Sequence, residues 1–215
     1  MKEIIKLTAL KDHVFDGMRI MVGGFMAVGT PEQIIDELVK IKVKDLTIIC
    51  NDAGFADLGV GKLIAAGQVK KLIASHIGLN PEAGRLMSEG LMECVLVPQG
   101  TLAEQIRAGG AGLGGFLTPT GIGTVVEEGK QVININDKDY LLELPLRADL
   151  ALLYGTTVDK YGNTNYTKTT RNFNPIMATA TDKVIVLARE MVDKIDPDNV
   201  MTPHIFVDYV IKEEK

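Results

Sequence analysis

The sequence contains no tryptophan, two cysteines, three histidines and few aromatic residues, which make up 5% of its 215 residues. So few aromatic side chains leave little material for stacking against nucleic-acid bases. The formal net charge of −5 also argues against nucleic acid and against an anionic membrane surface as partners. His13, His76 and His204 are far apart in the chain, so we expect no metal site.

Long apolar runs are missing as well. No segment approaches the roughly 18 apolar residues of a membrane span, and the start Met-Lys-Glu-Ile-Ile-Lys lacks the apolar core of a signal peptide. We therefore expect no membrane association and a cytoplasmic protein. Cys50 and Cys94 fall in or beside predicted strands, where buried, reduced thiols are the expected state.

The remaining composition is that of an ordinary globular protein, with 46% hydrophobic and 24% charged residues. A chain of this length forms one large domain or two small ones. We expect a single domain over residues 1–215.

Apolar runs alternate with helical segments in the first half of the chain. Strands are predicted at residues 18–22, 46–50, 69–75 and 93–97, each followed by a helix, which is the pattern of a parallel sheet. The run at 46–50 is almost wholly apolar, as expected when helices cover both faces of the sheet.

The pattern changes after residue 109, where a stretch rich in Gly, Thr and Pro begins. Short runs at 132–135 and 140–144 surround the turn at 136–139 and predict an inserted β-hairpin. The sheet is expected to resume at 150–153 and 184–187. The fold class is thus α/β, with a mostly parallel open sheet, helices on both faces and a small hairpin.

The most informative segment is Asp16 to Pro31, which reads Asp-Gly-Met-Arg-Ile-Met-Val-Gly-Gly-Phe-Met-Ala-Val-Gly-Thr-Pro. A strand leads into a glycine loop, and Thr30 with Gln33 predicts a capping box at the start of the next helix. Such a helix end favours a carboxylate, a phosphate or a thioester carbonyl. A purely structural strand-to-helix turn is the alternative.

Polar or glycine residues follow each of the four predicted strands. Since ligands of open α/β sheets bind beyond the carboxyl ends of the strands, we expect these residues to form one rim. The alternative is that polar residues only terminate the strands. The predicted rim contains Gly23–Phe25, Asn51–Asp52, Ser75–His76 and Gln99–Thr101.

Residues 110–115 match the dinucleotide-binding pattern of spaced glycines, but that motif needs a strand before it and a helix after it. Here a helix is predicted at 101–107, with Thr101 and Glu104 as a capping box, so we do not expect a dinucleotide site. The candidate ligand-binding cations are Arg107, Arg147 and Arg171, because each lies near a segment rich in turn residues or glycine. Surface ion pairing is the alternative.

The chain resembles the alpha subunit of family I coenzyme A transferases, of the acetate, butyrate and acetoacetate type. Residues 16–31 meet the family signature in full, and the resemblance extends over the whole chain. Further matching segments are Ala74–Gly78, Leu96–Leu102, Arg107–Gly115, Thr118–Gly121, Val126–Lys130 and Arg171–Pro175.

The resemblance implies a NagB/RpiA/CoA-transferase-like fold and an exchange of coenzyme A between an acyl thioester and a free short-chain acid. A glutamate forms an acyl anhydride and then a glutamyl-CoA thioester, in ping-pong order. In the family this glutamate belongs to the beta subunit, so we expect an α₂β₂ assembly. Coenzyme A is a substrate, and no other cofactor is expected.

The resemblance also implies roles for individual residues. Gln99 is the candidate hydrogen-bond donor to the oxyanion of the tetrahedral intermediate. The segment expected to contact coenzyme A contains Gly23, Gly24, Phe25, Met26, Ala27, Val28 and Gly29, while Asn51, Gly110 and Gly112 are expected to shape the acyl pocket.

His76 stands where the succinyl-specific branch usually has tyrosine, which favours a monocarboxylate substrate. Three alternatives remain open from the sequence. The chain could be a non-catalytic subunit that binds CoA esters or acts as a scaffold, or the alpha subunit of a succinyl-CoA:3-oxoacid CoA-transferase. A sugar-phosphate isomerase of the same fold would need an acid and a base, for which only Asp52 and His76 are candidates.

Overall fold

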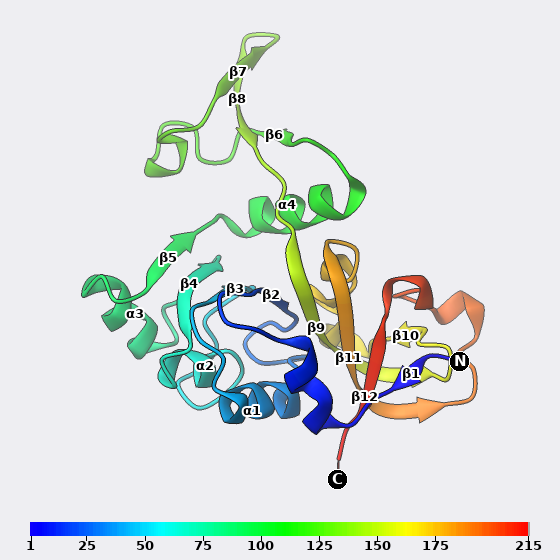
Figure 1. Cartoon of the computed structure of the whole chain (residues 1–215). Helices are drawn as coiled ribbons and strands as arrows, with labels where there is room; N and C mark the ends of the chain where they lie inside the picture. Colours follow the sequence, from blue (N-terminus) through cyan, green and yellow to red (C-terminus); the bar gives the residue numbers. More distant parts are fainter. Residues whose placement is uncertain (215) are drawn as a thin grey trace.

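The computed structural model describes residues 1–214, which form a large sheet with flanking helices and a small projecting sheet (Figure 1). The strands of the large sheet are β1 (Glu3–Ile4), β2 (Arg19–Val22), β3 (Leu46–Ile49), β4 (Val69–Ala74), β5 (Glu93–Leu96), β9 (Ala148–Asp159), β10 (Thr164–Asn165), β11 (Thr181–Val192) and β12 (Tyr209–Lys212). The α-helices are α1 (Glu32–Ile41), α2 (Gly61–Ala65), α3 (Pro81–Ser88), α4 (Gln99–Ala111) and α5 (Asn174–Met177). Short 3₁₀ segments are η1 (Leu7–His13), η2 (Val125–Glu127), η3 (Lys168–Arg171), η4 (Pro197–Asn199) and η5 (His204–Phe206).

The large sheet has the strand order β1-β12-β11-β9-β2-β3-β4-β5, and β10 pairs with β9. Along that order every neighbouring pair is parallel, whereas β10 is antiparallel. The four predicted strands agree with β2 to β5 to within one residue at each end, and the two later predictions fall inside the longer β9 and β11. The predicted open, mostly parallel α/β sheet is confirmed.

Each face of the sheet buries its own apolar layer, because successive side chains of a strand point to opposite faces. Ile20 and Ile48 pack with α1 residues such as Ile34 in one core, and Met21 packs with α4 residues such as Leu102 in the other. Helices α1 to α3 therefore cover one face and α4 and α5 the other, as the apolar run at 46–50 predicted. In residues 1–214 no helix has the length and apolar character needed to cross a membrane.

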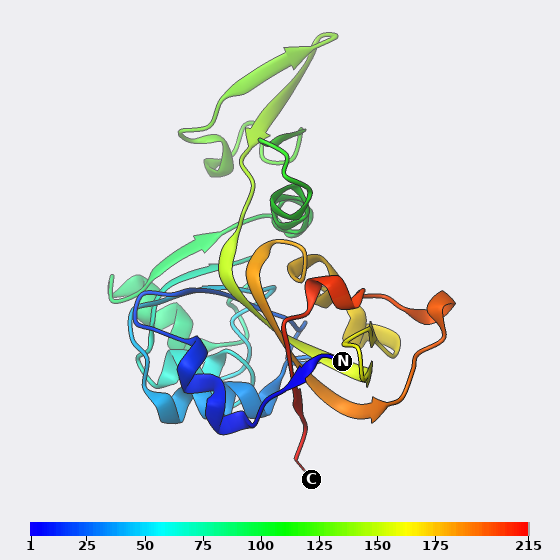
Figure 2. The same ribbon diagram turned by 45° about the vertical axis from the view of Figure 1, so that its right-hand side comes forward.

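The small sheet contains β6 (Phe116–Thr118), β7 (Val132–Ile135) and β8 (Lys138–Glu143) in the antiparallel order β6-β8-β7. It forms an arm that points away from the body in both views (Figures 1 and 2). The predicted hairpin is confirmed, with a third strand that the sequence did not indicate. Its turn is tighter than predicted, because Asn136 and Asp137 both have positive φ, as a two-residue type I′ turn requires.

A buried carboxylate fixes the base of the arm. Glu143, at the end of β8, accepts hydrogen bonds from Gln105 Nε2 of α4 at 2.9 Å and from Lys130 Nζ at 2.6 Å. Only 2% of the Glu143 side chain is exposed, so loss of the Lys130 charge would leave a buried anion without its counter-charge.

Both predicted capping boxes are wrong. Helix α1 begins after Pro31 without a side-chain cap, and Gln33 instead exchanges two hydrogen bonds with the backbone of Glu214. Helix α4 begins two residues earlier than predicted, after Pro98, which places Thr101 inside the helix with a buried hydroxyl that has no partner. In each case a proline, whose ring fixes φ, precedes the first helical residue.

Asp159, at the end of β9, ties two loops to the sheet. Its carboxylate accepts hydrogen bonds from the backbone N–H groups of Tyr161, Asn163 and Ile195 and from Asn163 Nδ2, at 2.9 to 3.2 Å. Burial alone would raise the pKa of this carboxyl, but the hydrogen bonds from Asn163 and from the backbone outweigh it and lower the pKa. Its stabilising effect is therefore present above the unfolded-state pKa of about 4 and is lost as the pH falls through the lower folded-state value.

We expect Asp159→Asn to lower the free energy of unfolding by about 1–3 kcal/mol near neutral pH, because an amide group then faces N–H donors. The difference from the wild type should shrink toward about pH 2–3, where the native carboxylate is itself protonated. Denaturant unfolding at several pH values measures both effects. Asp193→Asn is the control, since that side chain is 96% exposed, and a pH-independent gap for Asp159→Asn would contradict the assignment.

Candidate active site

Four loops meet where β2, β3, β4 and β5 end side by side at one edge of the sheet. They surround a cavity of about 450 Å³. The predicted rim is confirmed, and the cavity brings together the sequence-predicted Gln99, Asn51, Phe25 and Met26. Its lining residues are Phe25, Met26, Asn51, Asp52, Ser75, His76, Leu79 and Gln99.

Hydrogen bonds connect the polar residues of this cavity in series. Ser75 Oγ donates to Gln99 Oε1, Gln99 Nε2 donates to Asn51 Oδ1 at 2.5 Å, and Asn51 Nδ2 donates to Asp52 Oδ2 at 2.7 Å. A carboxamide nitrogen carries two N–H groups, so Gln99 keeps one donor beyond the bond to Asn51. The series fixes the orientation of that donor.

Gln99 is also the first residue of α4, a helix of 13 residues. The preceding Pro98 has no side chain that can cap the helix. The unpaired N–H groups of such an end carry partial positive charge and favour anions. The end of α4 and the Gln99 amide together suit a carboxylate or a developing oxyanion.

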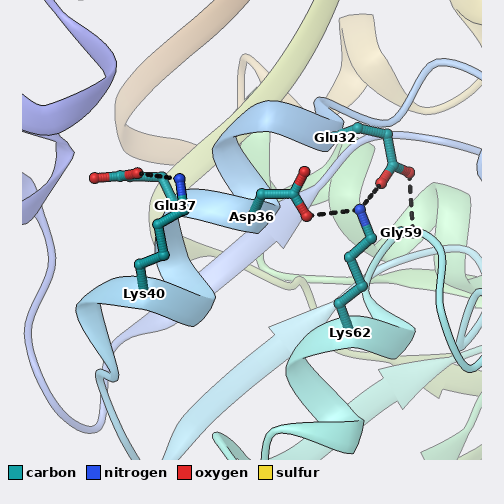
Figure 3. Close-up of polar contacts among 6 residues, drawn as sticks. All are labelled: Glu32, Asp36, Glu37, Lys40, Gly59 and Lys62. Carbon is teal, nitrogen blue, oxygen red and sulfur yellow. Dashed lines mark hydrogen bonds and ion pairs between the residues drawn. The ribbon is translucent and has the colours of Figure 1, made fainter.

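The start of α1, which the sequence suggested for this purpose, is occupied by the chain itself. Glu32 Oε1 accepts a hydrogen bond from Gly59 N at 2.9 Å, and Glu32 Oε2 lies 2.8 Å from Lys62 Nζ (Figure 3). Lys62 also pairs with Asp36 at 2.7 Å. Burial would lower the pKa of Lys62, but its bonds to Asp36 and Glu32 outweigh this and raise it. This helix end therefore holds an internal ion pair.

The glycine loop has a strained conformation that the sequence did not reveal. Phe25 and Val28 exchange two backbone hydrogen bonds at 3.0 and 2.9 Å, and the residues between them, Met26 and Ala27, have φ of 46° and 64°. Two positive φ angles in a two-residue turn define type I′, which non-glycine residues adopt at a cost. Gly24 and Gly29, which flank the turn, also have positive φ.

A second loop, after β3, has the same hydrogen-bond pattern. Phe55 and Leu58 exchange two backbone bonds at 3.2 and 3.3 Å, within Gly54-Phe-Ala-Asp-Leu-Gly59, which parallels Gly24-Phe-Met-Ala-Val-Gly29. This local similarity is visible in the sequence but was not among the predicted features. Two neighbouring strand-to-helix units thus present hairpin-like tips beside each other.

Three side chains hold the glycine loop, and none was predicted to have this role. Asp52 accepts from Met26 N at 2.8 Å, while Asn172 accepts from Gly24 N at 3.1 Å and donates to Val28 O at 2.8 Å. Asn174, fully buried, donates to Gly29 O at 3.0 Å. The sequence signal for the asparagines was the segment Arg171-Asn-Phe-Asn-Pro175, in which only the arginine was predicted to bind a ligand.

Gly110 and Gly112 lie away from the Gln99 cavity. Gly110 lines a separate cavity of about 500 Å³, together with Arg107 and Arg171, and a Cβ on Gly110 would overlap Thr179 Oγ1. Gly112 ends α4 in the left-handed conformation. A helix thus precedes these glycines, which confirms that the dinucleotide pattern is accidental, and the proposed acyl-pocket role of Gly110 and Gly112 remains a prediction.

Two of the three candidate arginines are engaged on the protein. Arg147 donates to Gly109 O and pairs with Asp182, and Arg107 pairs with Glu104 at 3.1 Å. These contacts match the surface-pairing alternative. Arg171 lines the cavity that it shares with Gly110.

The cysteines are free thiols, as predicted, with Cys50 buried and Cys94 half-buried. Burial, reinforced by the nearby Asp52 charge, raises the pKa of the Cys50 thiol well above its usual value. Burial also raises the pKa of Cys94. Both remain protonated at neutral pH and are poor nucleophiles. Among residues 1–214, no group of three or more His, Cys, Asp or Glu side chains is placed to hold a metal ion.

Comparison with known proteins gives close relatives over the whole chain. The alpha chain of the acetate CoA-transferase of Escherichia coli (strain K12) is 55% identical over 215 residues, covering 98% of each chain. That of the acetoacetyl-CoA:acetate/butyrate CoA transferase of Clostridium acetobutylicum is 52% identical over 213 residues, again 98% of each. One of the subunits of the succinyl-CoA:3-ketoacid coenzyme A transferase of Helicobacter pylori (strain J99) is 43% identical over 216 residues, covering 100% of this chain and 93% of that one.

Among solved structures, the acyl-CoA transferase YdiF of Escherichia coli O157:H7, in a thioester complex with CoA, matches with a TM-score of 0.87 and 22% identity. The match covers 99% of this chain and 47% of the YdiF chain, so the present chain spans about half the length of that protein. At this identity the similarity concerns the fold. The model of the family described as coenzyme A transferase matches residues 6–213, and with relatives of 55% and 52% identity the chain belongs to the coenzyme A transferase family.

Proposed function

We propose that this chain is the alpha subunit of a short-chain acyl-CoA:carboxylate CoA-transferase, which moves coenzyme A between acetoacetyl-, butyryl- or acetyl-CoA and a free short-chain acid. The whole-length relatives with 55% and 52% identity are alpha subunits of acetate and of acetoacetyl-CoA:acetate/butyrate CoA-transferases. The proposal thus follows both the sequence similarity and the chemistry of the cavity.

The observation that carries the proposal is a cavity with oriented donors and no available nucleophile. No glutamate lines it, and its single carboxylate, Asp52, accepts hydrogen bonds from Met26 N, Asn51 Nδ2 and Gly54 N. Both Asp52 oxygens are therefore engaged. Such a site is one half of an active site, whose nucleophile comes from another chain.

In this proposal a glutamate that the beta partner supplies attacks the acyl-CoA carbonyl carbon, and the coenzyme A thiolate leaves. The thiolate then attacks the resulting acyl-glutamyl anhydride and releases the first acid, which leaves a glutamyl-CoA thioester. The second acid reverses these two steps. Each attack passes through a tetrahedral intermediate whose oxyanion needs hydrogen-bond donors.

This chain supplies the donors and the wall. The free N–H of Gln99 and the positive end of α4 stabilise the oxyanion, and Asn51 holds the Gln99 amide in place. Phe25 and Met26 of the glycine loop form an apolar side of the cavity with Leu79. Apolar walls keep water away from an anhydride and a thioester, which would otherwise hydrolyse.

The cavity suits a monocarboxylate. None of its lining residues is lysine or arginine, whereas a second carboxylate on the substrate would call for a cationic partner. This favours acetate, butyrate or acetoacetate over succinate, although a succinyl-CoA-specific relative is 43% identical.

The alpha-chain relatives imply that the partner is a separate beta subunit. We propose an α₂β₂ assembly that works in the cytoplasm with coenzyme A as a substrate and without a metal or other cofactor. Neither nucleic acid nor a membrane takes part in this function.

The first test is reconstitution. This chain alone is expected to be inactive, and mixing with its beta partner should restore transfer of coenzyme A from acetoacetyl-CoA to acetate or butyrate. Borohydride treatment in the presence of acyl-CoA should then modify one glutamate of the partner. A pair that assembles tightly but exchanges coenzyme A with no short acid would show that the chain is a binding or scaffold subunit.

The second test is the Gln99 donor. Gln99→Ala should lower kcat of the assembled pair by about 100-fold, in the range found for loss of one oxyanion donor. Gln99→Glu, which keeps the size but has no N–H, should be similarly impaired, while assembly is unchanged. Gln33→Ala removes a glutamine that bonds only to Glu214 and serves as control. Turnover equal to that of the control would remove Gln99 from this role.

A further inference from the structure

We propose that Asn172 is a positioning residue for the transfer reaction, which acts by holding the two legs of the glycine turn at their working separation. The inference rests on the proposed function, since it assigns a role within the same site. It starts from the strain at Met26 and Ala27, whose positive φ angles are retained only when the surroundings impose them.

Asn172 reaches both legs of the turn with one side chain. Its Oδ1 accepts from Gly24 N at 3.1 Å, on the entering leg, and its Nδ2 donates to Val28 O at 2.8 Å, on the leaving leg. The same two atoms are anchored to their own segment, Oδ1 by Phe173 N at 2.7 Å and Nδ2 by Thr169 O at 2.8 Å. Only a side chain that both accepts and donates from a single planar group meets these four demands.

Asn174 supports the same segment from below the loop. Its Nδ2 donates to Gly29 O and Thr170 O at 3.0 and 2.9 Å, and its Oδ1 accepts from Tyr154 N of β9 at 3.0 Å. A Cβ on Gly23 would overlap Asn174 Oδ1. Gly23 is thus a glycine because Asn174 lies against it, and the loop, the asparagine segment and the sheet form one packed unit.

The opposite side of the turn is held by Asp52, which accepts from Met26 N. Asp52 belongs to the cavity that contains Gln99, whereas Asn172 does not line that cavity. Instead, Asn172 lines a neighbouring apolar cavity with Phe25, Met26, Val28 and Thr169. Asn172 therefore reaches the reacting groups through Phe25 and Met26, which border both cavities.

This arrangement has a chemical consequence that simple packing would not have. In Asn172→Asp the carboxylate still accepts from Gly24 N and Phe173 N, but it faces the carbonyl oxygens of Val28 and Thr169 without a proton to donate. Protonation of the introduced carboxyl returns one O–H donor. The defect of this variant should therefore become smaller as the pH falls.

The experiment measures kcat and KM of the assembled alpha–beta pair with acyl-CoA from about pH 8 to about pH 5. Asn172→Asp is expected to lower kcat about 10- to 100-fold at the upper end, the loss associated with a displacement of about 1 Å at a reacting site. The deficit relative to the wild type should shrink toward the acid end, with a smaller change in KM. Assembly of the pair and the unfolding midpoint should stay close to those of the wild type.

Asn165→Asp is the matched control, because Asn165 Nδ2 donates to the carbonyl oxygen of Asn199 and to no residue of the glycine loop. It should retain the activity and pH profile of the wild type. As a readout that does not depend on turnover, hydrogen exchange of the segment 23–30 should be at least several-fold faster in Asn172→Asp than in the control.

Wild-type activity and exchange in Asn172→Asp, or an activity deficit that does not change with pH, would overturn the positioning role. Failure of the proposed function looks different, since the unmodified pair would then transfer coenzyme A to no short acid. In that case the exchange measurement still decides whether Asn172 holds the loop.

Discussion

The Asp52 carboxylate is the point on which the rest of the site depends. It lies just after β3, is 7% exposed, and accepts hydrogen bonds from Met26 N, Gly54 N and Asn51 Nδ2. One side chain thereby links the glycine loop, the similar loop after β3 and the amide series that orients Gln99. A charged acceptor that receives several N–H donors is among the stronger polar anchors that a protein has. The same bonds leave Asp52 unavailable as a nucleophile, so its structural role and the incompleteness of the cavity have one cause.

The sheet and its rim were predictable because their signals are local. Apolar runs such as 46–50 and the polar residues that follow them are visible in the sequence, and parallel pairing brings their ends together. The capping boxes failed because their signal is local while the outcome is not: Gln33 is drawn to Glu214, 181 residues away. Asn172 escaped notice for the same reason, since its partners Gly24 and Val28 lie 148 and 144 residues earlier. The left-handed backbone of Met26 and Ala27 follows from these distant contacts and from no property of those two residues.

Two neighbouring helix ends in this protein serve different purposes. The start of α1 is neutralised by Glu32, whose charge is in turn matched by Lys62, and this pair joins α1 to α2. The start of α4 has no such internal anion and opens beside Gln99. The difference lies in one residue at each end, an acid at the first position of α1 and an amide at the first position of α4. The macrodipole is used for cohesion in one case and is left for a ligand in the other.

The absence of a glutamate from the lining of the cavity has a consequence for the timing of the chemistry. A chain that has oriented donors but no nucleophile binds a thioester without consuming it, so newly made copies do not drain the acyl-CoA pool before they find a partner. Reactivity then begins only when two gene products meet, which makes their pairing the switch for the reaction. The buried Asp52 keeps that switch closed, because the one carboxylate within reach of the substrate is already fully engaged.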